Sequence, residues 1–296
     1  MTPEAILREP ARVLAEADRR RYFEDGFVVV EGLVPADWLA RLNERSAAFI
    51  EASRQVSASN EAYDLGPEHA PATPHVRRLK ATVDRDPLFW AFASGAPMAD
   101  IAADLVGADV KFHSSKINYK HPGGSEVVKW HQDIQAWPHT NYSPVTLGIY
   151  LDDVTPEMGP LACLPGSQEG PLFRHTDRDG NWRGAIAEAD LANLDLDRAV
   201  AATGPAGTLV AINCRTVHAS RANLSDRVRP MLLYIYSSAD AMAWMPPPSP
   251  TRHTGEIVRG SPARHAHVDP RPCPVPPDWS KQGYGSIFVA QPGEGM

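Results

Sequence analysis

The chain has few cysteines, no excess of basic residues and no long apolar run. Its 296 residues include only Cys163, Cys214 and Cys273, an odd number without paired spacing, so no disulfide framework is expected. Acidic residues outnumber basic ones by 36 to 29, and the net charge of −7 argues against a nucleic-acid or anionic-membrane surface. Apolar stretches such as Met231–Tyr236 are far too short to span a membrane.

The N-terminal residues contain no basic stretch followed by an apolar run, the pattern that a secretory signal peptide requires. Together with the sparse cysteines, this predicts a reduced, cytoplasmic protein. Hydrophobic residues make up 43% of the chain and charged residues 22%, which is ordinary for a globular protein with a substantial core. The composition leaves the oligomeric state open.

The N-terminal third, residues 1–108, has mainly helical patterns. The run from residue 56 to residue 77 has no periodicity and is interpreted as a loop. Elsewhere in this third, the apolar spacing and the Pro and Gly positions predict helices over 3–25, from 35 onward and over 97–106, with a strand over 27–30.

Residues 109–240 contain short β-prone runs separated by Gly- and Pro-rich turns. Repeated strands of this kind predict a jelly roll, the cupin-like double-stranded β-helix. Residues 241–296 are rich in proline and are predicted to be an irregular cover, so that 1–296 forms one domain, mainly β with flanking α-helices. The six predicted strands are Val110–Tyr119, Val127–His131, Val145–Leu151, Leu161–Leu164, Thr208–Ile212 and Met231–Ser237.

His131 and Asp133 end one of these predicted strands. Side chains two residues apart point to the same face of a strand, so an imidazole and a carboxylate lie side by side. A second predicted strand, Thr208–Ile212, leads through a polar turn to His218. Two histidines and one carboxylate on one face of a metal leave three positions open, as in non-haem Fe(II) oxygenases.

Arg229 follows His218 by eleven positions, at the start of an apolar strand. A guanidinium offers two parallel donors to a carboxylate and cannot lose its charge. An arginine beside such an apolar run needs a partner if it is buried. Arg221 and Arg227 are rivals, and a surface position for Arg229 would be expected if the metal ligands were absent.

These segments, taken in order, resemble the phytanoyl-CoA dioxygenase family of Fe(II)- and 2-oxoglutarate-dependent oxygenases, which includes ectoine-hydroxylase-like enzymes. The similarity covers most of the chain. Two departures, Met158 and Gln168, lie away from the metal ligands. The matching segments are Arg21–Val30, His131–Asp133, Leu151–Thr155, Gly159–Leu161, Pro165–Ser167, His218–Ser220 and Arg229.

The resemblance implies the cofactor Fe(II), the co-substrates 2-oxoglutarate and O2, and a small-molecule substrate. It implies His131, Asp133 and His218 as metal ligands, with Ser220 and Arg229 at the 2-oxoglutarate carboxylate. Three further residues fall near positions that contact co-substrate or substrate: Lys116 and Thr146 are assigned to the co-substrate and Lys80 to the substrate. With Asp133 present, hydroxylation or a related oxidation is expected rather than halogenation.

Three aromatic residues are predicted to contact the substrate: Trp137 and His139, which follow the metal strand, and Trp244 from a later loop. Ordinary core packing is an equally good interpretation of each. His113 and His121 are predicted at the mouth of the barrel, together with His139. The tail histidines, His265 and His267, are interpreted as solvated loop residues.

Two other functions use the same residues. A cupin-like hydrolase or isomerase would bind Zn(II) or Mn(II) through these ligands and would have no co-substrate for Arg229 to hold. A barrel that binds a small ligand without turnover would need no intact ligand set.

Overall fold

Two antiparallel sheets form the core of the protein in the computed structural model, which describes residues 2–123, 126–277, 279 and 287–291. The large sheet has the order β1-β9-β6-β11-β4-β3-β2, with β12 paired to β4, and the small sheet has the order β5-β10-β7-β8. The strands are β1 (Phe27–Val30), β2 (Tyr63–Leu65), β3 (Val76–Lys80), β4 (Val110–Lys120), β5 (Val128–His131), β6 (Val145–Tyr150), β7 (Leu161–Cys163), β8 (Val200–Ala202), β9 (Leu209–Asn213), β10 (His218–Ser220), β11 (Arg229–Ser238) and β12 (Ile257–Arg259).

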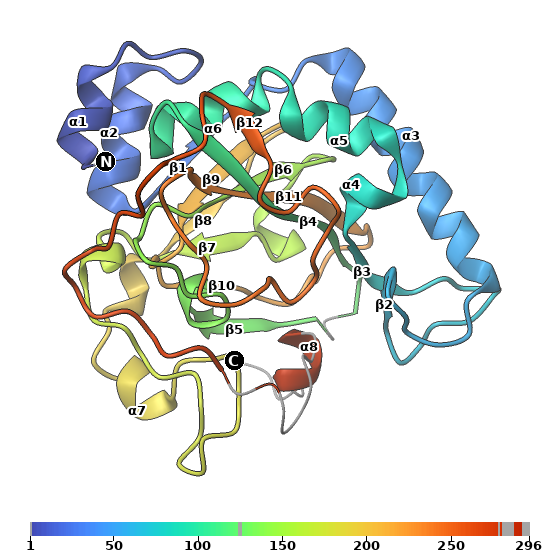
Figure 1. Cartoon of the computed structure of the whole chain (residues 1–296). Coiled ribbons are helices and arrows are strands. Elements are labelled where there is room, and N and C mark those ends of the chain that lie inside the picture. The colour runs from blue at the N-terminus through green and yellow to red at the C-terminus, as the bar shows by residue number, and fades with distance from the viewer. Residues whose placement is uncertain (1, 124–125, 278, 280–286, 292–296) are drawn as a thin grey trace.

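Helices cover one side of the large sheet, and the small sheet lies on its other side (Figure 1). None of the helices in the described part of the chain is both long and apolar enough to cross a membrane. The helices are α1 (Pro3–Arg8), α2 (Glu16–Asp25), α3 (Ala36–Ala52), α4 (Thr82–Arg85), α5 (Pro87–Ser94), α6 (Met98–Val106), α7 (Glu188–Leu191) and α8 (Ile287–Ala290).

Strand β11 separates the helical layer from the space between the sheets. Side chains alternate along a strand, so successive residues point to opposite faces. Tyr234 and Tyr236 face the helices, where their hydroxyls donate to the carbonyls of Phe89 and Ala93 at 3.0 and 2.8 Å. Arg229, Met231 and Leu233 face a cavity between the sheets. The same alternation in β4 turns Lys116, Asn118 and Lys120 toward that cavity.

The predicted mainly-β fold with two sheets is confirmed, but several local predictions were wrong. The predicted helix over 3–25 is two helices, because Pro10 cannot donate the helical hydrogen bond and restricts the residue before it. The loop predicted over 56–77 contains β2 and the start of β3, and the helices α4 and α5 were not predicted.

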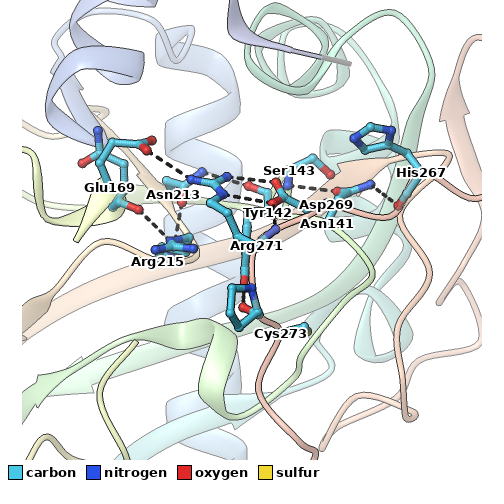
Figure 2. Close-up of polar contacts among 12 residues, drawn as sticks. Asn141, Tyr142, Ser143, Glu169, Asn213, Arg215, His267, Asp269, Arg271 and Cys273 are labelled. Carbon is cyan, nitrogen blue, oxygen red and sulfur yellow. Dashed lines mark hydrogen bonds and ion pairs between the residues drawn. The ribbon is translucent and has the colours of Figure 1, made fainter. Parts of the chain in front are cut away.

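Among the described residues after 240, the chain is mostly irregular apart from β12 and α8. Figure 2 shows how one part of it is fastened to the core. The Arg271 guanidinium stacks over the Tyr142 ring at 4.8 Å and pairs with Glu169 at 3.1 Å. The Tyr142 hydroxyl donates to the Pro272 carbonyl. Tyr142 and Glu169 lie within residues 109–240, the jelly-roll part of the chain. These contacts therefore hold the cover against the core.

Candidate active site

The two histidines and the carboxylate predicted as metal ligands lie together between the sheets. His131 ends β5 and pairs in register with His218, the first residue of β10. Asp133 follows in a short 3-10 turn. Its Oδ1 atom lies 3.7 Å from His131 Nε2 and 3.9 Å from His218 Nε2. These distances are too long for hydrogen bonds, but two metal–ligand bonds of about 2.1 Å can span them.

Backbone carbonyls orient both imidazole rings. Nδ1 of His131 donates to the Lys129 carbonyl at 2.8 Å, and Nδ1 of His218 donates to the Thr216 carbonyl at 2.9 Å. Because a carbonyl only accepts, the proton is on Nδ1 and the lone pair of Nε2 is free for a metal. Burial, and then the charge of His218, lowers the pKa of His131 to about 3, which keeps the ring neutral.

Thr146 on β6 orients the carboxylate ligand. Its hydroxyl donates to Asp133 Oδ2 at 3.0 Å, which leaves Oδ1 toward the two histidines. Burial alone would raise the pKa of Asp133, but His218 and His131 lower it overall. Asp133 is therefore ionised, and a donor set of two imidazoles and one carboxylate suits Fe(II).

Arg229 lies in the same cavity without an acidic partner. It is 4% exposed, its guanidinium stacks 5.6 Å from the Tyr150 ring centre, and its Nε has no hydrogen-bond acceptor among the described residues. The rival Arg227 instead points outward and pairs with Asp152, with 55% of its side chain exposed. A buried cation without a partner is costly, so the site is suited to an incoming carboxylate.

The cavity has a volume of about 120 Å³ and brings together most of the predicted residues. Besides the ligands and Arg229, its walls include Lys116, Thr146, Ser220 and Trp137.

Three predicted substrate residues lie elsewhere. His139 is 1% exposed, and its Nδ1 donates to the Trp137 carbonyl at 2.7 Å. With Trp244, which is 55% exposed, it lines a separate cavity of about 350 Å³. Lys80 donates to the Asn60 carbonyl and is not among the residues that line the metal cavity.

Of the histidines predicted at the mouth, His113 also lines the separate cavity, and His121 packs against His75 with ring centres 4.0 Å apart and the ring planes tilted by 38°.

Several residues around the cavity were missed. Asn118 belongs to the predicted strand Val110–Tyr119 and Lys120 directly follows it, and their period-two spacing with Lys116 could have revealed a polar inner face. Arg78 lies on β3, a strand that was not predicted and whose first two residues were interpreted as loop. His175 Nε2 accepts from the Gln132 amide at 2.9 Å and so fixes the turn between the first two ligands. A contact between such distant segments has no local sequence pattern.

Comparisons with known proteins agree with this geometry. Among curated proteins, a probable alpha-ketoglutarate-dependent hypophosphite dioxygenase of Stutzerimonas stutzeri is 32% identical over 225 residues, which are 75% of this chain and 78% of the relative. An ectoine dioxygenase of Stutzerimonas stutzeri is 27% identical over 251 residues, which are 78% of this chain and 79% of the relative.

Solved structures show the same fold. The apo form of EctD from S. alaskensis matches with a TM-score of 0.69 and 23% identity, covering 86% of this chain and 89% of that one. EctD has also been solved with Fe, and with 2-oxoglutarate and 5-hydroxyectoine. The model of the phytanoyl-CoA dioxygenase (PhyH) family matches residues 22–231. This match covers well over half of the chain, and the chain belongs to the phytanoyl-CoA dioxygenase family.

Proposed function

We propose that this enzyme, an Fe(II)- and 2-oxoglutarate-dependent dioxygenase, hydroxylates a small molecule that binds beside the metal. In the overall reaction one oxygen atom of O2 enters a substrate C–H bond and the other enters succinate, while CO2 is released. The observation that carries the proposal is the buried Arg229, which has no acidic partner among the described residues and lies in the same cavity as His131, Asp133 and His218. A hydrolase or isomerase built on the same ligands would have no use for that buried guanidinium.

The residues of the chain would bind and orient the metal and the co-substrate. His131, Asp133 and His218 would hold Fe(II), which supplies the activation of O2 when it is bound. Arg229 would hold the far carboxylate of 2-oxoglutarate through two parallel N–H donors, with the hydroxyl of Ser220 beside it. Ser220 is 4% exposed and lines the same cavity.

The presence of Asp133 favours one of two kinds of oxidation, hydroxylation or halogenation. A carboxylate ligand fills the position that a halide takes in related halogenases, so oxygen transfer is favoured over halide transfer. The Thr146 hydroxyl keeps this carboxylate in its orientation.

The size of the cavity favours a small substrate. A volume of about 120 Å³ has room for roughly ten water-sized groups, and 2-oxoglutarate alone would occupy most of it. Relatives named for hypophosphite and for ectoine also act on small molecules. We expect a compact substrate at the open side of the cavity, near Trp137, rather than an acyl-CoA.

Succinate formation under O2 tests the proposal. The purified protein with Fe(II) and 2-oxoglutarate is expected to form succinate slowly without substrate, and His131→Ala is expected to abolish this activity through loss of the metal. His265→Ala removes an exposed tail histidine and serves as the matched control. Succinate formation by His131→Ala at the wild-type rate, or none by the metal-loaded wild type with any candidate substrate, would reject the function.

A further inference from the structure

Four cationic side chains enter the cavity as two pairs. Lys120 and Arg229 are register partners on β4 and β11. Lys116 lies four residues before Lys120 on β4, about 13 Å from it along the strand. Arg78 on β3 is opposite Asn118, which lies between the two lysines, and all of these side chains line the same cavity. Among the neighbouring charges, that of Arg78 lowers the pKa of Lys116 most and that of Arg229 lowers the pKa of Lys120 most, so the four side chains group as two pairs in one cavity.

Both members of the Lys120 and Arg229 pair already have partners or an assigned role. The Lys120 ammonium donates to three backbone carbonyls, those of Glu126, Ser220 and Arg221, at 2.5, 3.2 and 2.6 Å. All three of its N–H groups are therefore used within the protein. Arg229 is the proposed partner of the 2-oxoglutarate carboxylate.

The Arg78 and Lys116 pair has no acidic partner among the described residues. Arg78 is 4% exposed; its Nε donates to Asn118 at 2.9 Å, and its guanidinium lies 5.2 Å from the Phe288 ring centre. No hydrogen bond of the Lys116 ammonium to a described residue is present. Burial, followed by the charge of Arg78, lowers the pKa of Lys116 to about 8.

The carboxylates around this pair are engaged elsewhere. Asp64, the register partner of Arg78 on β2, pairs with Arg77 at 3.0 Å, and the two carboxylates that line the cavity are Asp133 and Glu126. Asp133 is a metal ligand that accepts from Thr146. Glu126 contacts His75 through Oε1 and accepts the His121 amide through Oε2 at 3.0 Å. Neither carboxylate forms an ion pair with Arg78 or Lys116 in the described part of the chain.

The charges of the loaded site leave this pair uncompensated. The positive charges of Fe(II), Arg229 and Lys120 equal the negative charges of Asp133, Glu126 and doubly ionised 2-oxoglutarate. Two adjacent cations in a buried cavity repel one another and are desolvated, which is unfavourable until an anion binds between them. A dianion would match both charges.

We propose that Arg78 and Lys116 form the substrate anion site, and that the substrate is a small molecule with a tetrahedral phosphorus oxyanion, held beside the metal. This inference rests on the proposed function. It assigns Lys116 to the substrate rather than to the co-substrate, because Lys116 pairs with Arg78 and not with Arg229. A guanidinium and an ammonium together offer donors to several oxygens of such a group.

Methylphosphonate is the probe that tests the site. It is titrated without O2 into the protein loaded with Fe(II) and 2-oxoglutarate, and binding is followed by the tryptophan fluorescence, because Trp137 and Trp182 line the cavity. Dimethyl methylphosphonate, a neutral diester of similar shape, and propanoate, a carboxylate, are titrated in parallel. We expect methylphosphonate to bind most tightly and the diester least.

Arg78→Gln and Lys116→Gln are each expected to weaken methylphosphonate binding roughly ten- to hundredfold and to leave the affinity for 2-oxoglutarate unchanged. Arg45→Gln removes an equal charge from an exposed ion pair with Asp86 and is the matched control. Thermal unfolding of each variant verifies that it is folded. If one variant does not fold, the other still tests the site.

Each other outcome overturns the proposal. Equal binding of methylphosphonate and its diester would exclude an anion site, and tighter binding of propanoate would exclude the phosphorus oxyanion. An equal loss of 2-oxoglutarate affinity in Arg78→Gln would assign the pair to the co-substrate. The visible band of the Fe(II)–2-oxoglutarate chelate keeps the two proposals separate: without the band the proposed function fails, whereas a band without methylphosphonate binding rejects only this inference.

Discussion

Replacing Arg229 by glutamine removes the guanidinium that is proposed to hold 2-oxoglutarate. The wild-type side chain is 4% exposed and has no acidic partner among the described residues, so a bound carboxylate would be its main ionic contact. Truncating one partner of a buried, hydrogen-bonded charge pair costs about 2–5 kcal/mol. We therefore expect the Kd of 2-oxoglutarate to rise by roughly two orders of magnitude, which corresponds to about 3 kcal/mol.

The assay is a titration of 2-oxoglutarate into the Fe(II)-loaded protein without O2, followed by the visible charge-transfer band. Arg227→Gln is the matched control. It removes the same charge from a residue two positions before Arg229 whose side chain is exposed and pairs with Asp152. Arg229→Lys keeps the charge and loses the planar fork, so an intermediate affinity is expected.

The stability of the metal-free protein gives an independent test. Since the buried guanidinium has no acidic partner before the co-substrate binds, Arg229→Met should leave the free energy of unfolding unchanged or raise it, by about 1–3 kcal/mol. Wild-type affinity for 2-oxoglutarate in Arg229→Gln would refute the assignment of the clamp. A large loss of stability in Arg229→Met would show that Arg229 supports the fold instead.

Three further predictions concern the metal ligands, pH and the cover. Thr146→Val removes the hydrogen bond to Asp133 and should lower metal affinity about 10- to 100-fold in a competition titration with a chelator; unchanged affinity would contradict the role of Thr146. Burial lowers the pKa of His139 from 6.5 to about 4. As the pH falls, the unfolded chain takes up this proton first, so the free energy of unfolding should drop between these values, by about 2 kcal/mol at pH 5. In urea unfolding, the His139→Gln variant should lack this drop in the free energy of unfolding. The same pH dependence in the variant and the wild type would contradict the role of His139. Arg271→Ala, which loosens the cover, should cost about 1 kcal/mol of stability and leave 2-oxoglutarate affinity unchanged.

That His131 and Asp133, two of the three proposed metal ligands, lie together could be predicted because their spacing is local. His131 and Asp133 are two residues apart, and the strand pattern before them was sufficient to place both side chains on one side. Asp133 lies in a 3-10 turn rather than in the strand, yet the two side chains still converge. The pairing of His131 with His218 depends on the register of two strands far apart in sequence, and only the ordered family resemblance indicated it.

The substrate side of the cavity could not be predicted in the same way. Arg78 belongs to a short strand whose partner, β4, lies some forty residues away, and no local periodicity reveals such a pairing. Trp244 was expected to contact the substrate from a loop after the predicted strand Met231–Ser237. The chain after that strand instead turns toward the second cavity, where the Trp244 amide donates to the Pro138 carbonyl at 3.0 Å.

Gln168, one of the departures from the family pattern, is accommodated by the turn that contains it. Its side-chain amide donates to the carbonyls of Phe23 and Glu24 at 3.1 and 3.0 Å, at the end of α2. This departure therefore lies in packing between α2 and a loop, away from the metal ligands.

Anaerobic absorption spectroscopy tests the central claim most directly. Adding 2-oxoglutarate to the Fe(II)-loaded protein without O2 should produce the weak visible charge-transfer band of the chelate. The band should be absent from Asp133→Ala, which cannot hold the metal, and should require higher 2-oxoglutarate concentrations in Arg229→Gln. A protein that binds Fe(II) through His131, Asp133 and His218 and yet shows no band at saturating 2-oxoglutarate would contradict the account.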